Sequence, residues 1–361
     1  MNKKIRLLFC LIILTSAAHP QQDTLKNPAD TTSQGEYYEI FTDVDLSKPE
    51  EPLRIEIEFD YRDFLQMKYQ DTSLQASLSV FDRDSLLYST TVKIKARGQS
   101  RRKICFFPPF ELNFKKSDPD AVYTGEMNKL KVVTQCKNNE VNQQYLIKEY
   151  LCYKMLNLLT DYSLKVRIVE IKFTDSAGKV KPYTNYGFIL ETHDHFAERI
   201  SAFPVEIMGI RMKQTDYDAF HLMTVFQFMI GNTDWDVPSL HNIKLYKLQD
   251  FLKPNPVPVT YDFDYAGLVN ADYAVPHVRF GTTSVRERVY MGYCIPYDDF
   301  QTVFKHFLDK EEQFYSLVNN CEWLEKYNKT DMVRYMGEFF AIIKNQKMAE
   351  VNITKRCVTE E

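Results

Sequence analysis

GNTDWDVPSLHN, residues 231–242, and YDFDYAG, residues 261–267, are the two stretches that decide the fold expected for this chain. The first follows an apolar run at 217–230 that predicts a buried helix, with a glycine where helices commonly end. Between the two stretches, residues 242–248 and 257–263 have the pattern of paired strands joined by a Pro-rich loop. Because the strands of a hairpin run antiparallel, we expect the two acidic stretches to lie side by side.

Side chains in these stretches are of the types that phosphoryl transfer needs. That reaction uses divalent metal on the phosphates and an Asp that orients the acceptor hydroxyl. Asp234, or Asp236 two residues later, is the candidate for the orienting acid. Asn242, Asp262 and Asp264 supply oxygen ligands of the kind that Mg²⁺ or Mn²⁺ accepts. The alternative is that the first acids are turn residues and that Asp-Phe-Asp is an edge strand, and the spacing leaves both open.

A second group of candidate residues is basic. Residues 93–103, KIKARGQSRRK, place cations on both sides of a glycine turn. Gly98 and Ser100 lie in the turn, and Arg97 and Arg101 flank it. Exposed backbone N–H groups beside cations are typical of a phosphate cradle. A solvated basic hairpin tip is the alternative, and the charge pattern favours it equally.

The order of the expected elements predicts a two-lobed α+β domain. Residues 51–191 show strand alternation, as in LRIEIEFD at 53–60, and predict a β-rich lobe with an antiparallel sheet. A helix capped by Asn142 interrupts these strands. Residues 192–361 carry the apolar helix, the acidic stretches and further helices, and predict a mainly helical lobe. Atypical kinase-like domains have this order of elements.

In such a domain, three further residues are candidates for the nucleotide site. Lys115, on the strand after the basic turn, is placed to contact a phosphate. Glu149, on the helix that begins near Asn142, could pair with that lysine, although an exposed i,i+4 contact is the commoner role for such a residue. Glu191 ends a predicted strand and would lie near the adenine.

Two histidines follow that strand. His193 and His195 alternate as metal ligands on a strand would, but no third ligand is near them in the sequence. Loop histidines are therefore the favoured interpretation.

The first residues predict export. Residues 1–20 combine basic Lys3, Lys4 and Arg6 with a short apolar run and small residues, as a signal peptide does. Residues 21–50 are polar and predict a flexible leader. No later run is long and apolar enough to span a membrane, so none is expected after cleavage.

Charge argues against nucleic acid as a partner. The chain has 45 Lys and Arg against 49 Asp and Glu, and loss of the three basic signal residues leaves 42 against 49, a net charge of −7. General nucleic-acid binding needs a net basic face. Six cysteines remain beyond the predicted signal and are expected to form one to three disulfides or to stay as structural thiols. They are Cys105, Cys136, Cys152, Cys294, Cys321 and Cys357.

Taken together, these segments resemble the spore-coat protein H (CotH) kinase family of secreted atypical kinases. Within about residues 90–270, the resemblance rests on a basic turn, a helix after an Asn-rich turn, a Gly-to-Glu strand, an Asn-x-Asp segment with a later Asn, and an Asp-x-Asp strand. In this chain these are KARGQSRR (95–102), NNEVNQQYLIKEYL (138–151), GFILE (187–191), NTDWDVPSLHN (232–242) and DFD (262–264).

The resemblance implies ATP and divalent metal as cofactors, with protein hydroxyls as phosphate acceptors. The chain departs from the family at Gln99, at the Cys-Phe-Phe-Pro-Pro segment after the basic turn, and in the long interval between Asp234 and Asn242. Because of that interval, Asp236 is the alternative to Asp234 as the aligned acid. Two other functions stay open: a non-catalytic kinase-like protein that binds or assembles partners in the envelope, and a metal-dependent hydrolase that uses the same acids.

Overall fold

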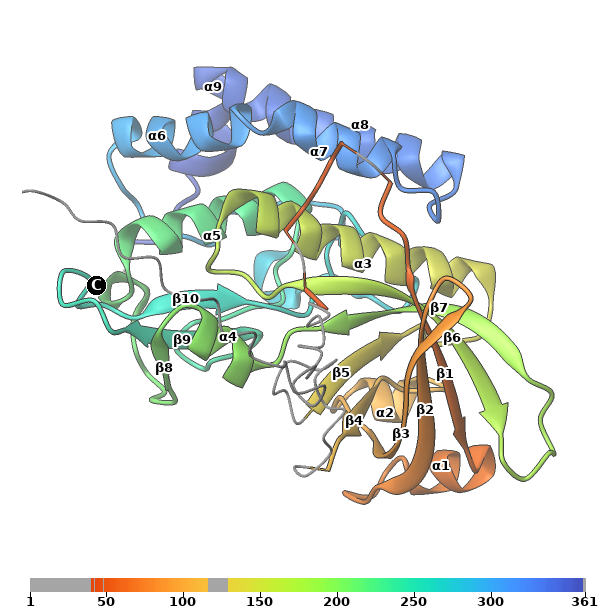
Figure 1. The fold of residues 1–361 in the computed structure, drawn as a ribbon. Helices are drawn as coiled ribbons and strands as arrows, with labels where there is room; N and C mark the ends of the chain where they lie inside the picture. The colour runs from red at the N-terminus through yellow and green to blue at the C-terminus, as the bar shows by residue number, and fades with distance from the viewer. Residues whose placement is uncertain (1–39, 42, 48, 116–128, 360–361) are drawn as a thin grey trace, which may run out of the picture. The chain divides into compact units, whose positions relative to one another are not determined.

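The first half of the chain folds into a closed barrel of strands. The computed structural model describes residues 40–41, 43–47, 49–115 and 129–359. Within these residues, seven strands are ordered β1-β2-β3-β4-β5-β7-β6 around the barrel (Figure 1). They are β1 (Leu53–Phe59), β2 (Leu74–Asp82), β3 (Ser85–Ala96), β4 (Phe110–Asn113), β5 (Lys129–Thr134), β6 (Val166–Asp175) and β7 (Tyr183–Leu190).

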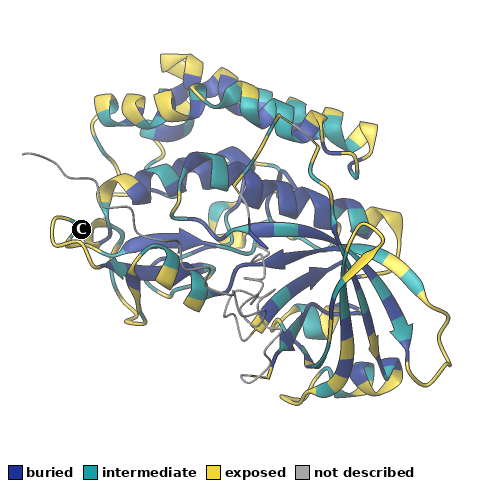
Figure 2. Cartoon of the chain, in the orientation of Figure 1, coloured by how far each residue is buried: buried dark blue, intermediate teal, exposed yellow. Residues whose placement is uncertain are grey.

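Alternation along each strand fills the barrel interior with apolar side chains. In β1, Ile55, Ile57 and Phe59 are buried, whereas Glu58 between the last two is exposed (Figure 2). Six of the seven strand pairs are antiparallel, as the sequence predicts. The pair that closes the barrel, β1 with β6, is parallel and departs from the expected antiparallel sheet. This pair joins strands that are far apart in the sequence, and local sequence patterns do not reveal such a pairing.

The helix expected from Asn142 is present and begins slightly earlier. α3 spans Glu140–Leu159, and the side chain of Asn139 caps it by accepting a hydrogen bond of 2.9 Å from the Asn142 backbone N–H. The cap is therefore Asn139 rather than Asn142. α5 covers Tyr217–Ile230 as predicted, and Gly231 ends it with a left-handed φ of 65°.

A second, three-stranded sheet has the order β10-β9-β8. The strands are β8 (Ala202–Val205), β9 (Ile243–Leu248) and β10 (Val257–Thr260). The hairpin of β9 and β10 was expected from the sequence, and β8 was not. α4 (His193–Arg199) lies where loop histidines were expected, since the Thr192 side chain caps a short helix there.

Two layers of helices cover these strands. α3 packs on β6 and β7, and α5 on β10, while α6, α7 and α8 contact the other side of α3 and α5 (Figure 1). α3 and α5 are therefore largely buried (Figure 2). The remaining helices are α1 (Tyr61–Met67), α2 (Arg101–Ile104), α6 (Tyr297–Leu308), α7 (Glu311–Asn319), α8 (Lys326–Lys344) and α9 (Gln346–Ala349), with short helical turns at Met212–Gln214, Val278–Phe280 and Glu350–Thr354.

Two disulfides join segments that are distant in the sequence. Cys105 pairs with Cys136, and Cys294 pairs with Cys357. Cys152 and Cys321 are buried free thiols. Both of the outcomes expected for the cysteines, disulfides and structural thiols, therefore occur.

The chain is an α+β protein, as predicted. The described residues fall in one compact unit, Tyr37–Glu361, so the division into lobes at 51–191 and 192–361 stays a prediction. The predicted signal peptide at 1–20 lies outside the described residues. Near the end of the expected flexible leader, 21–50, the apolar side chains of Ile40 and Phe41 are buried in the barrel core. These two residues are therefore ordered against the barrel, contrary to the expected flexibility. In the part of the chain that the structure describes, no helix has the length and hydrophobicity to cross a membrane.

Candidate functional site

The two acidic stretches belong to one closed loop of the chain. At the hairpin, the backbone N–H of Tyr261 donates to the carbonyl oxygen of Asn242 over 3.1 Å. At the outer ends, the N–H of Gly267 donates to the carbonyl oxygen of Gly231 over 3.0 Å. The hairpin thus joins both stretches, as the sequence predicts.

Both terminal positions of this loop require glycine. Gly231 has a left-handed φ of 65° that side chains rarely adopt. A Cβ on Gly267 would lie 2.5 Å from the carbonyl oxygen of Val285 and 2.6 Å from the hydroxyl of Tyr335. Close packing of the backbone therefore holds the ends of the two acidic stretches together.

Asp234 and Asn242 are in direct contact. The amide nitrogen of Asn242 donates to the Asp234 carboxylate over 3.0 Å and to the Asp234 backbone oxygen over 2.8 Å. His241 Nε2 is 2.8 Å from the other carboxylate oxygen of Asp234. Since the Asn242 nitrogen is used in this way, its side-chain oxygen is left without a hydrogen bond among the described residues and can accept a ligand.

Asp236 has a different environment. Its carboxylate accepts hydrogen bonds from the N–H and the hydroxyl of Ser239, and its backbone pairs with that of His241. These contacts are those of a turn-forming Asp. Of the two acids left open by the sequence, Asp234 lies with Asn242, and Asp236 stabilises the turn between them.

Asn242 and Asp262 share an unusual backbone conformation. Their φ angles are 51° and 66°, in the left-handed region that non-glycine residues adopt infrequently. Residues held in such conformations are concentrated at functional sites, at a cost of about 1–3 kcal/mol each. The buried hydroxyl of Tyr153, on α3, accepts a hydrogen bond of 2.8 Å from the Asp262 N–H and helps to fix this conformation.

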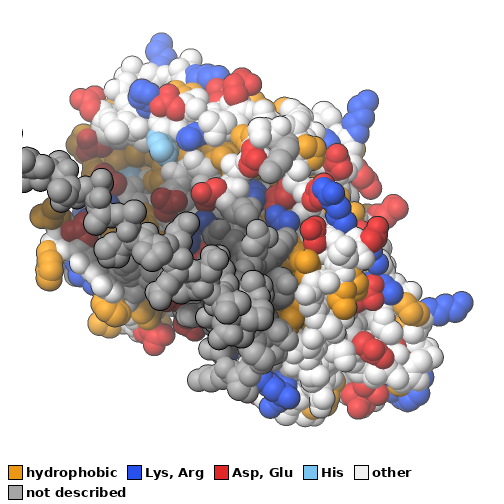
Figure 3. All heavy atoms as spheres, in the orientation of Figure 1, with side chains coloured by type: hydrophobic (Ala, Val, Ile, Leu, Met, Phe, Trp, Pro, Cys, Tyr) orange, Lys and Arg blue, Asp and Glu red, His pale blue; other side chains and the backbone are white. Residues whose placement is uncertain are grey.

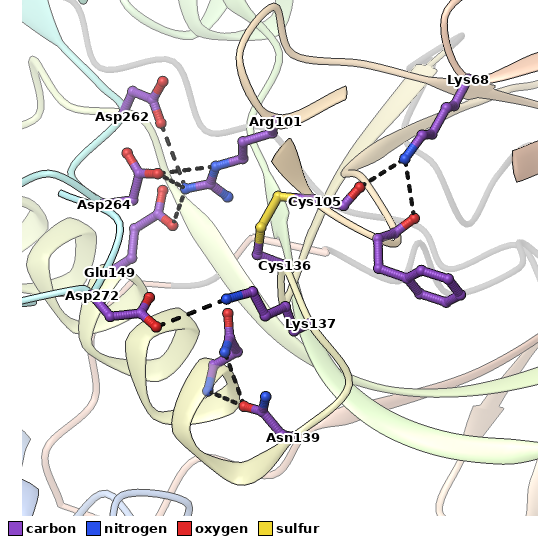
Figure 4. The surroundings of a disulfide bond; sticks show 12 residues. Lys68, Arg101, Cys105, Cys136, Lys137, Asn139, Glu149, Asp262, Asp264 and Asp272 are labelled. Carbon is purple, nitrogen blue, oxygen red and sulfur yellow. Dashed lines mark hydrogen bonds and ion pairs between the residues drawn. A yellow bond between two sulfur atoms is a disulfide. The ribbon is translucent and has the colours of Figure 1, made fainter. Parts of the chain in front are cut away.

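Arg101 lies between three carboxylates (Figure 4). Its Nη2 is 2.7 Å from Glu149 and 2.9 Å from Asp264, and its Nε donates to Asp264 over 3.1 Å. Asp262 is farther, at 3.8 Å. The side chains of Arg101, Glu149 and Asp264 are 14%, 4% and 8% exposed, whereas that of Asp262 is 48% exposed. Asp262 thus faces solvent, and the other three form a buried ion cluster.

Burial and the charges of neighbouring groups shift the pKa values of these side chains. Burial raises the pKa of the Glu149 carboxyl to about 8, although the Arg101 guanidinium opposes the shift. Partial burial, followed by the negative charge of Asp264, raises the pKa of Asp262 to about 6. Burial acts to lower the pKa of Arg101, but Asp264 and Glu149 together hold it well above its ordinary value. The concentration of acids therefore favours bound cations.

Three cations, Arg97, Lys131 and Lys244, lie within electrostatic range of one another, and the charges of Glu111 and Asp194 also act on Lys131. Burial, followed by the charges of Arg97 and Lys244, lowers the pKa of Lys131 to about 8. Burial and then the charge of Lys131 hold the pKa of His193 far below its ordinary value. Within the described ranges, the side chains of Arg97, Lys131 and Lys244 make no hydrogen bond or ion pair. We call these three residues the cationic group.

Arg97 connects the cationic group to the acids. Burial acts to lower its pKa, and the charge of Asp262 opposes that shift. Besides burial, the negative charges of Asp264 and Asp234 act in turn to raise the pKa of Asp262. Arg97 is therefore the residue that links the cationic group electrostatically to Asp262.

The other residues of the basic turn lie at the surface. Gly98 is exposed, and its φ of 86° requires glycine. Ser100 is also exposed, at the start of α2. The disulfide of Cys105 with Cys136 ties the end of α2 to the chain just after β5 (Figure 4).

Among the described residues, two predicted nucleotide contacts, Lys115 and Glu191, have no bond to the acids of the loop. Lys115 is exposed beyond β4 and lines a hollow of about 660 Å³ with Lys93 and Lys129, outside the acidic loop. Glu191 is fully buried, and its carboxylate accepts hydrogen bonds from Arg199, the Lys165 N–H and the ring of His195. Both oxygens of Glu191 are therefore used in the fold.

The two histidines do not converge on a metal. His195 pairs with Glu191, and His193 Nδ1 is 2.8 Å from the hydroxyl of Tyr246. More generally, no group of three or more His, Cys, Asp or Glu is arranged to hold a metal ion in the residues that the structure describes. A metal would thus need the amide oxygen of Asn242 or oxygens from a bound molecule.

The sequence did not point to Lys131 or Lys244, and it favoured an exposed i,i+4 role for Glu149. Glu149 is buried and bound to Arg101, so the exposed i,i+4 role does not apply. Lys131 lies on β5, the strand that directly precedes the helix carrying Glu149. That placement, a lysine on the strand before a glutamate-bearing helix, is the signal that could have identified it. Lys244 carries no such signal.

Charges on the visible surface are mixed. On the face shown in Figure 3, described acidic and basic side chains are interspersed rather than gathered in one basic area. The absence of a nucleic-acid partner stays a prediction.

No family model and no curated protein sequence matches the chain. Among solved structures, it is similar to a chain described as the crystal structure of a Helicobacter pylori proinflammatory kinase, CtkA. The TM-score is 0.39 at 10% identity, over 72% of this chain and 94% of that chain. This TM-score is too low to transfer fold or function, so the resemblance to the spore-coat protein H kinase family stays a prediction.

Proposed function

We propose that this chain is a kinase-like phosphotransferase that moves the terminal phosphoryl group of ATP to a protein hydroxyl with the help of Mg²⁺ or Mn²⁺. The observation that carries the proposal is the cationic group of Arg97, Lys131 and Lys244, which Arg97 links electrostatically to Asp262. Like charges that have no ionic partner among the described residues destabilise one another, and a bound polyanion would relieve that repulsion.

The donor set fits a hard divalent ion bound together with phosphate. Mg²⁺ is usually held by one or two carboxylates, with substrate phosphates and water completing its coordination. Asp262 is half-exposed, and the oxygen of Asn242 is available because its nitrogen is bound to Asp234. When bound, the ion would neutralise charge on the phosphates. These two residues are therefore the ones that would hold it.

The remaining residues take complementary roles. Asp234 would orient the acceptor hydroxyl, since it contacts Asn242 and is one-third exposed. The cationic group would hold the phosphates. The ion pair of Arg101 with Glu149 takes the place of the lysine–glutamate pair of kinases, which leaves Lys131 free for the nucleotide.

The same contacts make a two-metal hydrolase the weaker alternative. Such a site needs several carboxylates that converge on two ions. Asp236 is bound in a turn and Asp264 by Arg101. Fewer free carboxylates remain than the sequence suggested.

Export is part of the proposal. Two disulfides are the pattern expected of a chain that matures in an oxidising compartment, and they support the predicted signal peptide. The partners we expect are exported or envelope proteins that carry the acceptor hydroxyl.

Transfer of label from γ-labelled ATP tests this function. The purified chain, incubated with ATP, Mg²⁺ or Mn²⁺ and a mixture of hydroxyl-bearing peptides, should label itself or a peptide, and mass spectrometry should locate phosphate on a hydroxyl. Asp234→Asn should lower the rate about 10²–10⁴-fold, as loss of a positioned acid–base group does. Asp236→Asn is the matched control and should stay near the wild-type rate. Nucleotide binding without any transfer would instead identify a non-catalytic binding module.

A further inference from the structure

Asp264 was expected to be a metal ligand, yet its carboxylate is already occupied by a cation. Arg101 contacts it through Nη2 at 2.9 Å and Nε at 3.1 Å. The hydroxyl of Tyr273 also interacts with it. Only 8% of the Asp264 side chain is exposed, so little room remains for a hydrated ion.

The position of Arg101 is that of a shared cation rather than of a simple pair. One nitrogen lies 2.7 Å from Glu149, 2.9 Å from Asp264 and 3.8 Å from Asp262. A second metal ion at Asp264 would have to displace this guanidinium from the carboxylate.

Arg101 is held there by its backbone. It is the first residue of α2, and its carbonyl oxygen accepts a hydrogen bond of 2.9 Å from the N–H of Cys105. Cys105 is in turn joined to Cys136 (Figure 4). A guanidinium stays charged at every working pH, and its planar fork fits carboxylates. Because it is part of the chain, it cannot leave the site as a bound metal ion can.

We propose that Arg101 is a built-in cation that takes the place of a second metal ion, so that the site binds a single divalent ion at Asn242 and Asp262. This inference rests on the proposed nucleotide function and deepens it. Kinases use two Mg²⁺ ions held by an Asp and an Asn. Here Asp264 is a positioning residue that fixes Arg101 beside Asp262.

The number of Mn²⁺ ions bound per chain tests this assignment. Equilibrium dialysis with saturating non-hydrolysable ATP analogue, with unbound Mn²⁺ measured by electron paramagnetic resonance, should give one protein-bound ion in the wild type. Asp264→Asn should still bind one ion, whereas Asp262→Asn should bind none at the same concentration. Two ions in the wild type would overturn the inference and leave the proposed function standing. A wild type that binds neither analogue nor Mn²⁺ overturns both.

A second variant keeps the test valid if loss of Arg101 alone unfolds the protein. Removing one partner of a buried ion pair leaves the other charge uncompensated. The double variant Arg101→Gln/Glu149→Gln removes both partners of the buried pair and frees Asp264. It should bind two Mn²⁺ ions, and a count of one would contradict the inference. Arg102→Gln is the matched control, because Arg102 bonds the Gly98 carbonyl oxygen outside the cluster, and it should bind one ion.

Discussion

At the residue scale, the main difference between sequence and structure is the choice of lysine. The sequence favoured Lys115 because it follows the basic turn on a strand. The proposed site instead uses Lys131 one strand later, which lies opposite Glu111 in the register of β4 with β5 and within range of Arg97. Which lysine lies near Arg97 depends on the register and on which face of the strand it occupies, and one residue of shift reverses the face. Residue types alone do not contain that information.

The charge of Lys131 should make nucleotide binding depend on pH. Burial and neighbouring cations lower its pKa to about 8, so it is protonated below that pH and neutral above it. A triphosphate needs the protonated form. Its affinity, measured by calorimetry, should therefore fall about tenfold between pH 7 and pH 9.

Two variants isolate this effect. Lys131→Arg keeps its charge throughout that range, so its affinity should fall less than that of the wild type, and titration of the Glu149 carboxyl should account for the rest. Lys129→Arg, at the exposed start of β5, should behave like the wild type. An equal fall in affinity for Lys131→Arg would show that another group titrates.

At the scale of elements, local patterns predicted most helices and strands. α5 has the expected bounds because an apolar run and a helix-ending glycine are both local signals. The hairpin of β9 and β10 follows from alternation and a Pro-rich loop. The parallel pairing of β1 with β6 and the addition of β8 depend on distant partners, and the sequence did not reveal them. The disulfide pairing is likewise a property of the folded chain.

The Cys105–Cys136 disulfide should affect both stability and nucleotide binding. It anchors α2, which carries Arg101, to the chain after β5. The variant Cys105→Ser/Cys136→Ser should lose about 2–4 kcal/mol of unfolding free energy in chemical denaturation. It should also bind Mg²⁺·ATP severalfold more weakly, since Arg101 is no longer fixed.

The second disulfide provides the comparison. Cys294→Ser/Cys357→Ser should lose stability of similar size but keep its nucleotide affinity, because that bond has no link to α2. Equal weakening of binding in both variants would mean that general stability, rather than the position of Arg101, is responsible.

At the scale of the whole molecule, the candidate site depends on residues from segments that are far apart in the sequence. Arg101 comes from the turn after β3, Glu149 from α3, and Asp234, Asn242 and Asp262 from the closed loop beyond α5. The sequence identified the loop because the hairpin signal is local, and it identified the basic turn from its charge. It did not show that Arg101 and Glu149 meet Asp264, because that contact requires the barrel and helices to pack together.

Calorimetric titration of the full chain with ATP and Mg²⁺ tests the central claim most directly, namely that the acidic loop and the cationic group form one metal–nucleotide site. We predict binding that chelation of the metal weakens strongly. Asp262→Asn should weaken it by about 10–100-fold or more, as loss of a ligand or of its support does, whereas Asp236→Asn should bind as the wild type does. No binding by the folded wild type, or equal affinity in wild type and Asp262→Asn, would contradict the account.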